Sequence, residues 1–249
     1  MCGRYAAAKD PAALVEEFEA SAPAETLAPD YNVAPTKRVY IVVDRRRDEA
    51  RERSIEVARW GLVPSWAKDP TIASRLVNAR CETAAEKPAF RSAYAKRRCL
   101  VPADGYYEWY QPADGATGRG GKPLKQPFYI RRIDGRSLAM AGLYEWWKDP
   151  ALEADDPAAW RLTCTVITTA AADAIGRIHD RMPMIIEASD WAAWLDPDVT
   201  EDPQHLLTPA GEVGLEAYPV STAVNNVRNN GPELIEAVEA ASEAPPAGI

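Results

Sequence analysis

The sequence is poor in histidine and cysteine, and it has no long apolar run. The two histidines and four scattered cysteines form no C-x-x-C pair, so neither a zinc site nor a disulfide framework is expected. No segment reaches the roughly 20 apolar residues of a membrane-spanning helix, and the first 20 residues carry charges that a signal peptide lacks. These absences predict a cytoplasmic protein without a metal or other cofactor.

Charge alone argues against a nucleic-acid partner, because 29 basic and 37 acidic residues give a net charge of −8. The basic residues are nevertheless unevenly spread. Between positions 75 and 98 only two acids, Glu82 and Glu86, accompany seven basic residues: Arg75, Arg80, Lys87, Arg91, Lys96, Arg97 and Arg98. Two interpretations stay open, a local basic face on an acidic protein and an ordinary solvated helix face.

Short strand-like runs dominate the chain, and no alternation of strands and helices is sustained. Strands are expected at 39–43, 55–60, 99–102, 106–110, 127–133, 138–147, 162–169, 184–186 and 217–220. Helices are expected at 11–20, 79–98 (broken at Pro88), 171–178, 189–195 and 232–241, with a further short one at 203–207. The pattern predicts a single α+β domain over 1–241, with a largely antiparallel, barrel-like β-sheet core flanked by short helices, and a flexible tail at 242–249.

Cys2 directly follows the initiator Met1. Met aminopeptidases remove Met before a small residue, which predicts a mature chain with an amine and a thiol on adjacent carbons. Such a 1,2-aminothiol reacts with aldehydes: the amine forms an imine, and the thiolate closes a thiazolidine ring. The reference pKa values, about 8 for the amine and about 8.5 for the thiol, predict that a modest shift makes both groups nucleophilic. Taken alone, Met1-Cys2 favours the simpler interpretation, an incidental cysteine.

Three further side chains are candidates for proton transfer or positioning. On a strand, Glu108 shares a face with Tyr106 and Tyr110, and burial between aromatics would raise its pKa toward that of a general acid or base. The alternative is a Glu that points to solvent. His179 fits an acid/base or a structural histidine. Asn78 fits an active-site residue or the N-cap of the helix expected after it.

Arginines accompany these candidates. Arg4 lies near Cys2, Arg80 near Asn78 and Arg181 near His179. If the candidates converge, three guanidiniums would converge with them and suit a phosphodiester backbone. Trp109 would offer a face for base stacking.

Together, these signals follow a known pattern: the chain closely resembles the SOS-response-associated peptidase (SRAP) family, which crosslinks to abasic sites in DNA. Seven segments carry the resemblance in the family's order. They are Cys2-Gly3-Arg4, Tyr31-Asn32-Val33-Ala34-Pro35, Trp60-Gly61-Leu62-Val63-Pro64-Ser65-Trp66, Asn78-Ala79-Arg80, Ala103-Asp104-Gly105-Tyr106-Tyr107-Glu108-Trp109, His179-Asp180-Arg181-Met182-Pro183, and Val220-Ser221 through Asn225-Asn226 to Arg228-Asn229-Asn230. They span nearly the whole chain, which makes a chance match unlikely.

The resemblance implies a catalytic set and a DNA-binding set. The catalytic set is Cys2, Asn78, Glu108 and His179. The DNA-binding set is Arg4, Arg80 and Arg181 on phosphates, Trp109 and Pro35 on bases, and Thr168 as a helper. The implied function is covalent capture of abasic sites in single-stranded DNA, including single-strand/duplex junctions, by a monomer in the cytoplasm and on the nucleoid. Weak lyase activity and self-processing peptidase activity are also implied.

Two alternatives from other classes stay open. In one, an N-terminal-nucleophile peptidase or amidohydrolase uses Cys2 against an amide and needs no DNA. In the other, a nucleic-acid-binding module without catalysis binds abasic and intact strands equally and forms no covalent species.

Overall fold

The computed structural model describes residues 2–47, 50–111, 117, 125–153, 155–171, 173–199, 203–207 and 214–239. Its strands are β1 Tyr5–Ala7, β2 Asp30–Val33, β3 Arg38–Arg47, β4 Ala50–Trp60, β5 Asn78–Arg80, β6 Arg98–Ala103, β7 Gly105–Tyr110, β8 Gln126–Arg132, β9 Leu138–Lys148, β10 Trp160–Ala170, β11 Arg181–Pro183 and β12 Leu215–Pro219. Its α-helices are α1 Pro11–Phe18, α2 Arg91–Lys96, α3 Asp173–Ile178 and α4 Trp191–Leu195. Short 3-10 helices include η3 Ala188–Asp190 and η6 Pro232–Ile235.

Five strands close into a barrel. Hydrogen bonding follows the order β10, β4, β3, β6, β9 and returns to β10, because β10 pairs with both β4 and β9. Two short strands, β5 and β11, also pair with β10. The pairings of β10 with β4 and β5 are parallel, and the others in this sheet are antiparallel. The predicted α+β class with a largely antiparallel, barrel-like core is therefore confirmed.

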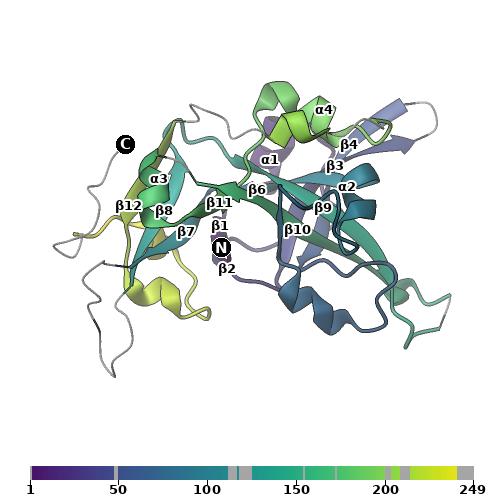
Figure 1. Ribbon diagram of the computed structural model, residues 1–249, viewed down its shortest axis with the longest axis horizontal. Coiled ribbons are helices and arrows are strands. Elements are labelled where there is room, and N and C mark those ends of the chain that lie inside the picture. Colours follow the sequence, from purple (N-terminus) through teal and green to yellow (C-terminus); the bar gives the residue numbers. More distant parts are fainter. Residues whose placement is uncertain are drawn as a thin grey trace.

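A second sheet packs beside the barrel. Its five strands run in the order β12, β8, β7, β1, β2, all antiparallel. In Figure 1 this sheet and α3 lie to the left, and the barrel with α1, α2 and α4 lies to the right. The strands β1 and β2 lie in the middle of the view. The start of the chain is therefore placed where the two sheets meet.

Alternation along β3 divides the apolar core in two. Val39, Ile41 and Val43 belong to a cluster that the barrel shares with the second sheet. Val42 points to the other face and belongs to a cluster with Phe18 of α1. The strand is thus buried on both faces, which explains its nearly continuous β-branched sequence.

Two helix predictions are wrong. Only Arg91–Lys96 is α-helical within 79–98, because residues 78–80 form β5 and pair with β10, and turns follow them. Likewise, 232–241 contains only the single turn η6, after which Ala237 forms a bridge with Val220. In both places a distant strand partner overrides local helix preference. The predicted tail, 242–249, lies outside the described residues.

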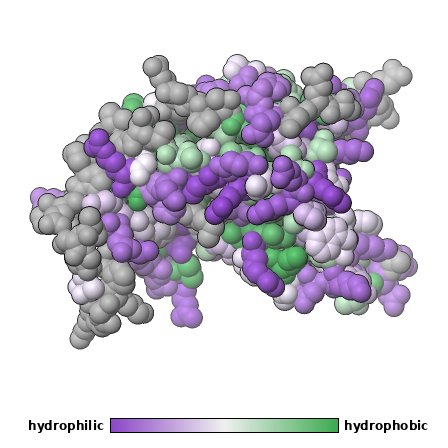
Figure 2. All heavy atoms as spheres, in the orientation of Figure 1, coloured by the Kyte–Doolittle hydropathy of each residue, from purple (hydrophilic) through white to green (hydrophobic). Residues whose placement is uncertain are grey.

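The described surface is mostly polar. Figure 2 shows hydrophilic side chains over most of the face turned to the viewer, interrupted by an apolar area. The most exposed tryptophans are Trp66 at 60%, Trp160 at 50% and Trp146 at 37%. Within the described ranges, no helix has the length and apolar character needed to cross a bilayer.

Candidate functional site

Cys2 is enclosed by the junction of the two sheets. The strand β1 pairs with β7 at Tyr5 and Tyr106, and the carbonyl of Arg4 accepts a hydrogen bond from the Tyr107 amide at 2.9 Å. This pairing draws the residues before β1 into the molecule. The Cys2 side chain is fully buried and belongs to the apolar cluster shared by both sheets.

Asn78 reaches Cys2 from the barrel side. It lies on β5, opposite Val166 of β10. Its side-chain Nδ2 donates a hydrogen bond to the backbone oxygen of Cys2 at 2.7 Å. The N-cap interpretation is therefore wrong, because Asn78 begins a strand and its amide holds the start of the chain.

Glu108 and His179 lie close to each other in the site. Glu108 lies on β7 and is 2% exposed, and burial raises the pKa of its carboxyl to about 7. The interpretation of Glu108 as an outward side chain is therefore wrong. His179 follows α3, and its Nε2 lies 4.0 Å from Glu108 Oε2.

The environment of His179 fixes the position of its proton. Its Nδ1 accepts a hydrogen bond from the backbone N–H of Arg181 at 3.0 Å. Asp180 Oδ1 also lies 3.0 Å from Nδ1, which would favour a protonated ring, but the backbone N–H can only donate. Burial lowers the pKa of the imidazole, so the neutral ring dominates near pH 7 and carries its proton on Nε2, toward Glu108.

The thiol of Cys2 does not have the lowered pKa that the sequence suggested. Burial is the main cause that raises its pKa well above the ordinary value, and the Glu108 carboxylate adds to the shift. The resting group is therefore S–H, and a base has to take its proton before sulfur can attack. Glu108 is the carboxylate whose charge acts on the thiol, and its pKa of about 7 suits a base for that proton.

Two of the three predicted phosphate-binding arginines are held by protein groups. Arg4 donates from Nη1 to Asn32 Oδ1 at 2.7 Å and to the Val224 carbonyl at 2.8 Å, and its guanidinium lies 5.7 Å from the centre of the Trp109 ring. Arg181 donates to both oxygens of Glu82. Arg80 is exposed at the end of β5. Convergence of the three on a DNA backbone stays a prediction.

The remaining predicted contacts lie near these arginines or in a turn. Thr168 is buried on β10, and its carbonyl accepts a hydrogen bond from Arg181 at 2.7 Å. Trp109 is partly exposed on β7 and donates from Nε1 to Asn225 Oδ1 at 2.6 Å. Pro35 is partly exposed in the turn between β2 and β3.

Asn32 is a positioning residue to which the sequence assigned no role. It is fully buried, orients Arg4, and donates from Nδ2 to the carbonyls of Asn226 and Asn229 at 3.1 and 2.9 Å. It thereby fixes the polar loop that presents Asn225 to Trp109. A buried amide on a short strand leaves only a weak sequence signal, because its partners are 194 and 197 positions away in the chain.

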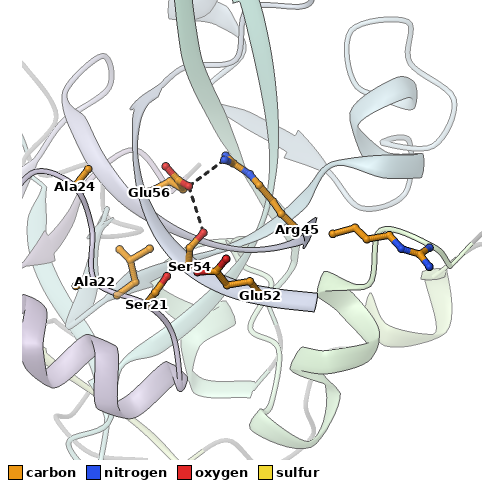
Figure 3. A pocket seen from close by; sticks show the side chains of 9 residues that line it. Ser21, Ala22, Ala24, Arg45, Glu52, Ser54 and Glu56 are labelled. Atoms are coloured by element: carbon orange, nitrogen blue, oxygen red, sulfur yellow. Dashed lines mark hydrogen bonds and ion pairs between the residues drawn. The ribbon is translucent and has the colours of Figure 1, made fainter. Parts of the chain in front are cut away.

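A pocket of about 250 Å³ lies elsewhere, and no predicted site residue lines it. It lies between the segment after α1 and the β3–β4 pair (Figure 3). Its polar groups are largely paired: Arg45 contacts Glu56 at 3.0 Å, and the Ser54 hydroxyl donates to the same carboxylate at 3.3 Å. Over the described ranges, no group of three or more His, Cys, Asp or Glu side chains is arranged to hold a metal ion.

Comparisons with known proteins agree on one family. A family model described as SOS response associated peptidase (SRAP) matches residues 1–227. Abasic site processing protein YoqW of Bacillus subtilis is 38% identical over 240 residues, which cover 95% of this chain and 99% of YoqW. Abasic site processing protein YedK of Escherichia coli is 32% identical over 249 residues, covering 96% and 100%. A crystal structure of a Bacteroides thetaiotaomicron protein superposes with a TM-score of 0.78 at 25% identity, covering 96% of this chain and all of that one.

Proposed function

The chain belongs to the SOS response associated peptidase (SRAP) family, and on that premise we propose that it captures abasic sites in single-stranded DNA as a covalent adduct of Cys2. Relatives named abasic site processing proteins support an abasic-site substrate. The observation that carries the chemistry is the arrangement at Cys2. Asn78 holds its carbonyl by a hydrogen bond of 2.7 Å, and the buried Glu108 carboxyl, whose pKa is about 7, acts electrostatically on its thiol.

The reagent is the N-terminal aminothiol that removal of Met1 leaves on Cys2. An abasic deoxyribose is a cyclic hemiacetal in equilibrium with an open-chain aldehyde at C1′. In its ionised form, Glu108 takes the proton of the C1′ hydroxyl as the ring opens. The Nε2–H of His179 donates a hydrogen bond to the ring oxygen as it leaves C1′, and that oxygen takes the proton that Glu108 has just received. The 4.0 Å between the two side chains lets both act on one sugar.

Bond formation then proceeds in two steps. The free amine of Cys2 adds to the aldehyde carbon, and loss of one water leaves a C=N double bond. The sulfur adds to that carbon, and the S–H proton ends on nitrogen, which closes the five-membered thiazolidine. Because burial keeps the thiol protonated, Glu108 carries this proton from sulfur to nitrogen. Asn78 keeps the amine and the thiol fixed during both steps by holding the backbone between them and β1.

The strand on either side of the lesion is bound through phosphates and bases. Arg80, which is exposed beside Asn78, contacts phosphate, as do Arg4 and Arg181. Trp109 and Pro35 pack on the neighbouring bases, and Thr168 supports Arg181. A net charge of −8 limits non-specific affinity for duplex DNA, which favours single strands and single-strand/duplex junctions.

The proposal also includes two further activities, an oligomeric state and a location. The imine permits β-elimination at the 3′ phosphate, which gives weak strand cleavage by a lyase reaction. The family's peptidase name corresponds to removal of Met1, or of any residues ahead of Cys2. The protein acts as a monomer in the cytoplasm and on the nucleoid.

A denaturing gel tests the proposal directly. Mature protein is mixed with an abasic oligonucleotide and with the same intact sequence, and we expect a denaturation-resistant band with the abasic strand alone. The Cys2→Ala variant should give no such band, and a band that persists in this variant would contradict the proposal. Peptide cleavage without DNA would instead indicate an N-terminal-nucleophile hydrolase. Equal mobility shifts without a covalent band would indicate a binding module.

A further inference from the structure

Arg181 is already bound to a carboxylate. Its Nη1 donates to Glu82 Oε1 at 2.6 Å, and its Nη2 donates to Glu82 Oε2 at 3.0 Å. This two-pronged geometry is the one in which arginine also binds phosphate. Glu82 lies two residues beyond β5 and is 48% exposed, whereas Arg181 begins β11 and is 15% exposed. The carboxylate therefore covers the outward edge of the guanidinium.

Glu82 stays charged under all conditions of DNA binding. The hydrogen bonds from Arg181 lower the pKa of its carboxyl to about 2. They also raise the pKa of the guanidinium. The pair is thus a fixed ion pair, and a phosphate that approaches Arg181 meets a full negative charge.

We propose that Glu82 is a specificity-determining residue, which occupies the phosphate-binding edge of Arg181 and so weakens the hold on DNA that lacks an abasic site. This inference rests on the proposed function. A phosphate must displace the carboxylate or share the guanidinium with it, and both cost affinity. An intact strand is held by such contacts alone, whereas an abasic strand is also held by the covalent bond. The competition therefore acts mainly against intact DNA.

A second set of contacts holds Arg181 in place without Glu82, so competition for phosphate can be distinguished from mere orientation of Arg181. The Nη2 of Arg181 also donates to the Thr168 carbonyl at 2.7 Å and lies 3.4 Å from the Thr168 hydroxyl oxygen. Thr168 is 3% exposed on β10, so this anchor is rigid. When the charge of Glu82 is removed, the guanidinium stays in place and no carboxylate competes with phosphate for its outward edge. If Glu82 only oriented Arg181, the same change would weaken DNA binding.

The test compares Glu82→Gln with the wild-type protein on an intact single-stranded oligonucleotide. We expect the dissociation constant to fall about three- to tenfold at low salt, and the slope of log affinity against log salt to steepen by about 0.7, the value for one more phosphate contact on a single strand. Glu187→Gln is the matched control, because Glu187 is 38% exposed and pairs with Arg132 at 3.2 Å. It removes the same charge and should leave affinity and slope unchanged.

A double-mutant cycle gives the deciding result. In an Arg181→Gln background, Glu82→Gln should change affinity less than twofold, because the guanidinium for which carboxylate and phosphate compete is absent. The inference is overturned if Glu82→Gln binds intact DNA no more tightly than wild type. It is also overturned if Glu82→Gln increases affinity equally with and without Arg181. Wild-type protein is first tested for its adduct with the abasic strand. Lack of that adduct counts against the proposed function, whereas the comparison on intact DNA reports on Glu82 alone.

Discussion

The side chain of Asn78 holds the backbone of Cys2 by a hydrogen bond of 2.7 Å between Nδ2 and the carbonyl oxygen. The two residues are 76 positions apart in the chain, and they meet because β5 pairs with β10 while β1 pairs with β7. One amide thus links the barrel to the start of the chain. The position of Cys2, the proposed nucleophile, therefore depends on Asn78, which makes no bond to the sugar in the proposed reaction.

Replacing Asn78 should slow capture without preventing DNA binding. We expect Asn78→Ala to lower the rate of adduct formation at saturating DNA about 10- to 100-fold, because the aminothiol loses its fixed geometry. Affinity for the intact strand should change less than twofold. Asn230→Ala is the control, since it loses hydrogen bonds to Tyr31 and Pro29 at the surface. An equally slow Asn230→Ala would contradict a specific role for Asn78.

Replacing the Cys2 sulfur with oxygen should separate the amine from the thiol. The Cys2→Ser variant keeps the amine and forms the imine, but the hydroxyl does not close a stable ring. We expect no adduct on a denaturing gel unless the imine is trapped with cyanoborohydride. Cys81→Ser is the control, because Cys81 is buried in the cluster on the other face of the barrel, and it should crosslink normally. Failure of the reductant to trap Cys2→Ser would contradict an imine intermediate.

Glu108 should give the capture rate its pH dependence. Because the working base is the carboxylate, the rate should rise with pH with a midpoint at about 7. Glu108→Gln should lower the rate about 100- to 10,000-fold and remove that midpoint. Glu145→Gln is the control, because burial also raises the pKa of the Glu145 carboxyl, which pairs with Arg97. This variant should keep the midpoint of the capture rate. A midpoint near 7 that survives in Glu108→Gln would assign the titration to another group.

The same carboxyl should lower stability at neutral pH. Its pKa is about 7 when folded and about 4.3 when unfolded, so the folded state binds the extra proton between these values. Its contribution to stability is therefore full below pH 4 and is lost as pH rises to 7. Relative to wild type, we expect the free energy of unfolding of Glu108→Gln to be about 2 kcal/mol larger, and the variant therefore relatively more stable, at pH 8 than at pH 5. Chemical denaturation at both pH values measures this difference, and no difference would contradict the assigned shift.

The local sequence pattern was sufficient to predict the strand that carries Glu108 into the site. Residues 106–110 alternate as a strand, and burial of Glu108 among aromatics raises its pKa in the predicted direction. The start of α1 at position 11 was equally predictable, and in the structure the Asp10 side chain accepts a hydrogen bond from the Ala12 N–H there. Both features depend on residues within one element.

What the sequence did not reveal depends on distant partners. Asn78 lies on a strand because β10 lies beside it, although the following residues favour helix. Glu82 and Arg181 are 99 positions apart, so no local pattern relates them. The raised thiol pKa of Cys2 likewise follows from enclosure by two sheets. Family resemblance identified these positions as relevant but gave no account of their contacts.

Burial of Cys2 also imposes an order of events during synthesis. The strand that encloses the start of the chain, β7, is made about 100 residues after β1, which takes roughly 5–20 s at ordinary translation rates. During that interval the terminus is open to aminopeptidases and to any free aldehyde in the cell. Once β7 and β5 are in place, the same atoms are enclosed. We therefore expect Met1 to be removed before β7 forms, and the enclosed terminus to react afterwards only with aldehydes that reach the site.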